Sequence, residues 1–185
     1  PFRGSWVDFT TDIYDCIYAI IDRRRKFPAS LLLRAIGFST NDDILDSFGL
    51  LNEFDLKKDR KVIVGRKVVS DIIDLNTGEI IIDRDSELSD KSIDACLDSG
   101  MKKINLLKKE DSLKSQILKN TFEKDPTNST EEALLLLYSH LRTGEAPNVD
   151  VAKKFIEKMF FSTKKYDLGA VGRYRINKKF GLDAS

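Results

Sequence analysis

The sequence contains no long hydrophobic run. Even its longest apolar stretches, such as Ala133–Tyr138, are far shorter than the roughly 20 residues that a membrane-spanning helix needs. We therefore expect no contact with a membrane and a cytoplasmic location. The chain opens at Pro1 without a methionine and without a basic-then-apolar leader, so we also expect that it is cut from something longer.

Cysteine and histidine are scarce as well. Cys16 and Cys96 stand far apart, outside any CxxC pattern and inside apolar stretches, which is typical of reduced, buried cysteines. His140 is the only histidine, so a zinc site would need an unusual set of ligands. We expect no bound metal.

Sequence motifs of catalysis are missing. Neither the phosphate-binding loop GxxxxGK[ST] nor the dinucleotide pattern GxGxxG occurs. His140 falls within a predicted helix with no evident partner, which favours a surface or capping role over a catalytic one. Asp83 and Asp85 would share one face of a strand, but no third ligand is marked beside them. We expect no catalytic residue and no cofactor.

Charge is unevenly distributed along a chain whose net charge is only +1. Residues 41–100 carry 15 acidic and 8 basic side chains, whereas residues 151–185 carry 9 basic and 3 acidic ones. A basic face formed by the two chain ends could meet phosphates. On charge alone, ordinary solvated faces are the better interpretation.

Two segments near the N-terminus predict a β-hairpin. Ser5–Thr11 and Cys16–Asp22 are rich in aromatic and β-branched residues, and the polar stretch 12–15 between them predicts the turn. This pairing would bring Trp6, the only tryptophan, close to Asp22 and Arg23. An aromatic face beside a guanidinium and an acceptor suits an unpaired nucleic-acid base. Alternatively, Trp6 fills the core beneath an arginine-rich rim, which composition alone favours.

The remaining chain is mostly helical. Pro28 should open a helix that Gly37 ends, and Thr40 with Asp43 predicts a capping box for a second one. Further helices are expected from caps and apolar spacing: Ser89 to Leu97, Leu113 to Phe122, Glu131 to Arg142, and a segment capped by Asn148 that runs to Phe160.

Two other regions have a weaker pattern. Lys61 to Asp83 reads as β structure around a turn at residues 76–78, and the chain beyond Phe161 is basic and irregular. A helix-turn-helix at residues 28–49 is unsuited to DNA, because Asp42, Asp43 and Asp46 would repel phosphates. The expected fold is one α+β domain over residues 1–185, mostly helical, with an N-terminal β-hairpin and a second small β element.

Six sequence blocks resemble the beta subunit of bacterial DNA-directed RNA polymerase. They run in the same order as in that family and cover nearly the whole chain. The blocks are Pro1-Phe2-Arg3-Gly4-Ser5-Trp6-Val7-Asp8-Phe9, Ile21-Asp22-Arg23-Arg24-Arg25-Lys26-Phe27-Pro28, Leu32-Leu33-Arg34-Ala35-Ile36-Gly37, Thr77-Gly78-Glu79, Asp125-Pro126-Thr127-Asn128, and Phe160-Phe161-Ser162 with Tyr166-Asp167-Leu168-Gly169-Ala170-Val171-Gly172-Arg173.

The resemblance implies the lobe domain of a nucleotidyltransferase, with downstream duplex DNA and the other polymerase subunits as partners. In that family the tryptophan matching Trp6 stacks on an unpaired base of the non-template strand. The residues matching Asp22 and Arg23 line the same pocket, which overrides the core-filling alternative for Trp6. The family's magnesium-binding aspartates belong to the other large subunit, so the resemblance implies that this chain alone is non-catalytic.

The chain departs from the family pattern in two places. Lys165 stands where many relatives have arginine, which keeps the positive charge but loses a two-pronged phosphate contact. Only residues 50–64 bridge a region where many relatives carry a long insertion, and the family pocket is completed by residues further along the subunit.

An alternative function is a docking module for transcription regulators that uses the acidic residues 41–100 without touching DNA.

Overall fold

The computed structural model describes residues 1–74, 76–110, 112–144 and 148–182. The chain divides into two compact units, and each is described by itself. Unit 1 consists of residues 1–39 and 120–185, and unit 2 of residues 40–119. No helix in the described ranges is long and apolar enough to cross a membrane. The prediction of one domain over residues 1–185 stays a prediction.

Unit 1 contains the predicted hairpin. Strands β1 (Val7–Thr11), β2 (Ile17–Ile21) and β3 (Phe27–Pro28) form an antiparallel sheet in the order β1-β2-β3, with Val7 opposite Ile21. Asp12 fixes the turn, because its Oδ1 accepts the backbone N–H groups of Tyr14 and Cys16, both at 3.0 Å. Such local side-chain bonds favour turns over continued strands.

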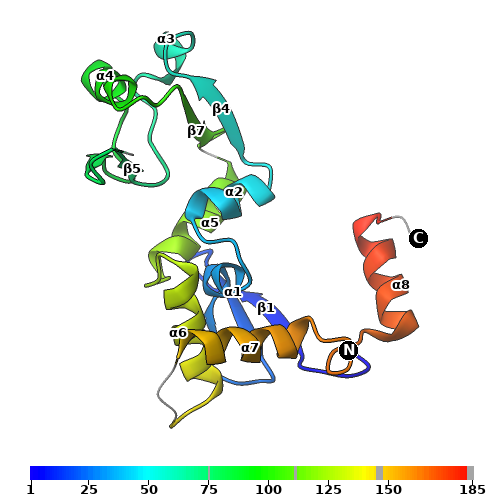
Figure 1. Cartoon of the computed structure of the whole chain (residues 1–185). Coiled ribbons are helices and arrows are strands. Elements are labelled where there is room, and N and C mark those ends of the chain that lie inside the picture. Colours follow the sequence, from blue (N-terminus) through cyan, green and yellow to red (C-terminus); the bar gives the residue numbers. More distant parts are fainter. Residues whose placement is uncertain (75, 111, 145–147, 183–185) are drawn as a thin grey trace. The chain divides into compact units, whose positions relative to one another are not determined.

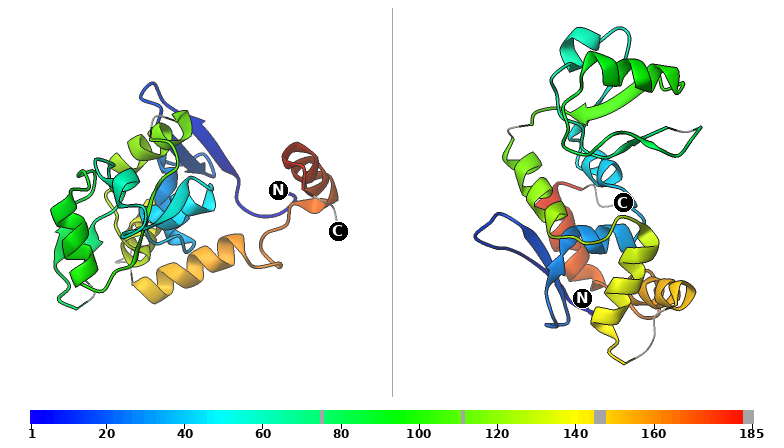
Figure 2. Two further views of the ribbon diagram at one scale, coloured as in Figure 1. Left: turned by 90° about the horizontal axis from the view of Figure 1, so that it is seen from above. Right: turned by 90° about the vertical axis from the view of Figure 1, so that its left-hand side faces the viewer.

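Helices cover this sheet and complete the core of unit 1 (Figure 1). They are α1 (Ala29–Ala35), α6 (Thr130–Leu141) and α7 (Val149–Phe160), and α6 and α7 lie side by side in both views of Figure 2. Their apolar faces meet the sheet through the fully buried side chains of Ile21, Leu31, Leu137 and Ile156. Pro28 precedes α1 directly, as predicted.

A buried ion pair connects α1 to the turn that precedes α6. Asp125 Oδ2 lies 3.2 Å from Arg34 Nε and accepts a 2.6 Å hydrogen bond from the Ser30 hydroxyl. Its other oxygen accepts from the Thr127 backbone and hydroxyl. This network gives the Asp-Pro-Thr block a structural role.

The first residues of unit 1 lie beside the start of α8 (Gly169–Phe180). The backbone N–H groups of Phe2 and Arg3 donate to the Asp167 carbonyl at 2.7 and 3.0 Å. Gly4 has φ +108°, and a Cβ added there would lie 2.7 Å from the Tyr166 ring. Only glycine fits this close approach, which therefore helps to fix where the chain enters β1.

The described residues of unit 2 form a core of their own and two small sheets. Strand β4 (Leu51–Asp55) pairs with β7 (Lys103–Leu107), and β5 (Ile72–Ile73) pairs with β6 (Ile80–Ile82). The helices are α2 (Asn41–Ser47), α3 (Arg60–Ile63) and α4 (Asp90–Asp98), and α5 (Leu113–Glu123) joins unit 2 to unit 1. Helices thus predominate over small antiparallel sheets, which confirms the α+β class.

The structure corrects the sequence interpretation at three places. Residues 61–64 are not a strand, because Asp59 accepts the N–H groups of Val62 and Ile63 and starts α3 instead. The segment after Phe161 is not irregular throughout, since α8 begins where Asp167 accepts the Gly169 N–H. Strands β4 and β7 were not predicted, because they pair across about fifty residues of chain.

Candidate nucleic-acid interface

Trp6 and Asp22 pair with each other at the end of the β1–β2 hairpin that lies away from its turn. The Asp22 N–H donates to the Trp6 carbonyl, and the Trp6 N–H donates to Asp22 Oδ1, both at 2.9 Å. These bonds continue the β1–β2 pairing one step past Val7 and Ile21. Trp6 and Asp22 therefore lie next to each other, as the sequence predicted.

The chain then reverses in a tight turn at residues 21–24. The Arg24 N–H donates to the Ile21 carbonyl at 3.0 Å, while Asp22 and Arg23 have φ values of +50° and +56°. Two successive positive φ angles define a type I′ turn, which usually contains asparagine or glycine. An arginine there costs about 1 kcal/mol or more, and backbone strain of this kind is concentrated at functional sites.

Trp6 faces solvent beside this turn. Its side chain is 61% exposed, which excludes the alternative in which it fills the core. A hollow of about 510 Å³ opens beside it, lined by Trp6, Asp8, Asp22 and Arg23. The structure therefore brings all three sequence-predicted site residues to one hollow and adds Asp8.

The three arginines that follow Asp22 have separate surroundings. Arg23 lines the hollow, whereas the Arg24 guanidinium donates to the Leu141 carbonyl at the end of α6. Arg25 lies near His140, whose ring stacks on Phe27 with centroids 6.1 Å apart. Burial, and then the charge of Arg25, lower the pKa of His140. Only Arg23 of this run faces the hollow.

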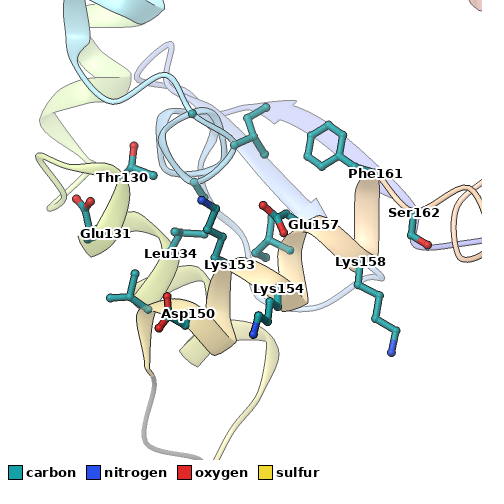
Figure 3. Close-up of a pocket in the computed structure, with 15 residues that line it drawn as sticks. Thr130, Glu131, Leu134, Asp150, Lys153, Lys154, Glu157, Lys158, Phe161 and Ser162 are labelled. Carbon is teal, nitrogen blue, oxygen red and sulfur yellow. The ribbon is translucent and has the colours of Figure 1, made fainter.

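Two other hollows lie on unit 1. The larger, about 1050 Å³, runs between the end of α1, the start of α6 and α7 (Figure 3). Its charged rim is balanced, with Lys153, Lys154 and Lys158 against Glu131, Asp150 and Glu157. A smaller apolar depression of about 280 Å³ is lined by Val7, Phe9, Leu32, Ile36, Phe160, Phe161 and Tyr166. The Ser162 hydroxyl also lines the larger hollow.

Both cysteines are buried. Cys16 and Cys96 are free thiols, and burial is the main cause that raises the pKa of each. A raised pKa keeps a thiol protonated and a poor nucleophile. Within the described ranges, no group of three or more His, Cys, Asp or Glu side chains could hold a metal ion.

Comparison with known proteins assigns the family. A family model described as RNA polymerase Rpb2, domain 2, matches residues 99–185. The DNA-directed RNA polymerase subunit beta of Flavobacterium psychrophilum is 44% identical over 202 aligned residues, which cover 99% of this chain. Those of Christiangramia forsetii and Porphyromonas cangingivalis are 45% and 43% identical, again over 99% of the chain. The chain belongs to the RNA polymerase beta-subunit family.

This beta-subunit segment spans 16% of the length of those relatives. The sequence resemblance is thereby confirmed, and its first two blocks are the ones that build the Trp6 hollow. Sequence reasoning missed Asp8. The signal was available, because alternate residues of a strand share a face, and Asp8 lies two positions after Trp6.

Proposed function

We propose that this beta-subunit segment is a DNA-contacting lobe that holds an unpaired base of the non-template strand and helps to hold the downstream duplex during transcription. One observation carries the proposal: the single tryptophan is 61% exposed on a hollow that Asp22 and Arg23 also line. The relatives are named DNA-directed RNA polymerase subunits. We propose the same nucleotidyltransferase assembly, with its other subunits and DNA, as the partners of this chain.

The residues of the hollow suit a base more than a phosphate. An exposed indole offers a flat face for stacking, worth roughly 1–3 kcal/mol per base. Arg23 supplies the one positive charge, which can reach the backbone beside that base. Asp8 and Asp22 carry two negative charges, which disfavour a phosphate inside the hollow. The segment thus holds DNA without taking part in the chemical step.

Replacing Trp6 tests the proposal. In polymerase assembled from the full-length subunit, Trp6→Ala should shorten the lifetime of promoter open complexes by roughly fivefold to a hundredfold, because stacking on the unpaired base is lost. Trp6→Phe should recover part of the lifetime. Lifetimes are measured by challenging preformed complexes with a competitor and following their decay.

Phe9→Ala is the matched control. Phe9 is 62% exposed and lies three residues after Trp6, on β1, but lines the apolar depression instead, so its loss should leave the lifetime unchanged. Equal lifetimes for Trp6→Ala and the unaltered enzyme would reject the stacking role. That result would favour the alternative, a docking module for regulators on the acidic residues of unit 2, such as Glu79 and Asp83.

A further inference from the structure

The Asp22 carboxylate is already bonded inside the protein. Its Oδ1 accepts the Trp6 N–H, and its own N–H donates to the Trp6 carbonyl. Both backbone groups of Trp6 are therefore paired with one residue. These bonds hold the backbone of Trp6, from which the indole projects.

The backbone of Asp22 supports the same role. Its φ of +50° lies in the left-handed region, which aspartate and asparagine adopt more readily than other side chains. Arg24 holds the far side of the turn by its N–H bond to Ile21 and its guanidinium bond to Leu141. The turn is thus fixed at both ends before any ligand arrives.

Asp8 provides the contrast. It lines the same hollow as Asp22, and within the described part of the chain its carboxylate has neither a hydrogen bond nor an ion pair. Each of the two carboxylates brings one negative charge to the hollow, but only the carboxylate of Asp22 is bonded to Trp6. The two residues can therefore separate an effect of charge from an effect of position.

We propose that Asp22 is a positioning residue: it holds Trp6 in place for stacking and acts as a hydrogen-bond acceptor, not through its charge. The proposal rests on the proposed function, since it assigns a role within the same hollow. A neutral acceptor should then be sufficient at position 22. Asparagine keeps both the Oδ1 acceptor and the preference for positive φ, whereas alanine loses both.

Asparagine and alanine variants at positions 22 and 8 test this assignment. In polymerase assembled from the full-length subunit, open complexes of Asp22→Asn should live about threefold to tenfold longer than those of Asp22→Ala, because one hydrogen bond distinguishes them. Open complexes of Asp8→Asn and Asp8→Ala should have equal lifetimes, since neither substitution removes a hydrogen bond to Trp6. Glycine tolerates positive φ but has no side-chain acceptor. Open complexes of Asp22→Gly should therefore be as short-lived as those of Asp22→Ala.

A fluorescent base analogue gives a readout of stacking itself. Promoter DNA carries 2-aminopurine at successive non-template positions of the open region, because its fluorescence falls when it stacks. The position whose signal rises in Trp6→Ala marks the stacked base. At that position, Asp22→Ala should raise the signal as well, whereas Asp22→Asn should leave it unchanged. The double variant Trp6→Ala with Asp22→Ala should resemble Trp6→Ala alone.

The outcomes separate the two proposals. If no position responds to Trp6→Ala, the stacking function itself fails. If a position responds but Asp22→Asn is as defective as Asp22→Ala, the carboxylate acts through its charge, and the positioning role is overturned. It is equally overturned if Asp22→Ala behaves like the unaltered enzyme, or if the losses of the two single variants add in the double variant.

Discussion

Consecutive residues of the same type have different surroundings in this chain. Arg23, Arg24 and Arg25 are identical in type and consecutive, yet the first lines a hollow, the second donates to the end of α6, and the charge of the third lowers the pKa of His140. The type I′ turn decides this, because it points successive side chains in different directions. No rule based on residue type could have assigned these three roles.

Stability should depend on pH through His140. Its lowered pKa means that the unfolded chain binds a proton more readily than the folded chain. The free energy of unfolding is therefore at its full value above about pH 6.5 and falls as the pH drops through the lowered pKa. In His140→Phe, which keeps a ring against Phe27, denaturant midpoints of the 185-residue chain should fall less on acidification. Parallel curves for both proteins would contradict this.

Among the features of the helices and strands, the capped N-terminal ends of helices were predicted best from the sequence. Thr40 and Asp43 form the expected capping box, and Ser89 and Asn148 cap α4 and α7 as expected. Caps act within three residues of chain, so their signal is local. Elements held by distant partners were predicted least well, since β4 finds β7 only when unit 2 folds. Helix α8 has no buried side chain in the described chain, so its apolar pattern was weak.

Asp125 should stabilise α1 far more than an exposed acid stabilises its helix. Asp125→Ala would leave the buried Arg34 guanidinium without its carboxylate, at a cost of about 3–5 kcal/mol. Asp94→Ala is the matched control, because it removes an acid from the exposed pair with Arg60 and should change little. Chemical denaturation of the 185-residue chain measures both. Similar midpoints for the two variants would refute a special role for Asp125.

At the scale of the whole molecule, the buried hydrophobic side chains of the described residues form two cores. One is centred on Leu31 and Leu137 in unit 1, and the other on Ile63 and Leu106 in unit 2. Sequence patterns predicted one domain, because helices and strands follow one another without a low-complexity linker. Two cores within one chain raise the question of whether they unfold together.

Leu106→Ala should reveal how far the units depend on each other. Removing this fully buried side chain costs about 2–5 kcal/mol. If the units unfold separately, hydrogen exchange should speed up at amides of unit 2, while the β1–β2 hairpin of unit 1 keeps its protection. Equal acceleration in both units would instead support the single domain that the sequence predicts.

The sequence alone determined the family, the α+β class, the hairpin and most helix ends, because these depend on residue order and on contacts a few positions apart. Only the tertiary structure decided that Trp6 is exposed, that Asp8 joins its hollow, and that Arg24 turns away from it. These facts depend on which face of β1 packs on the core. That choice is made by distant helices and cannot be read from the hairpin itself.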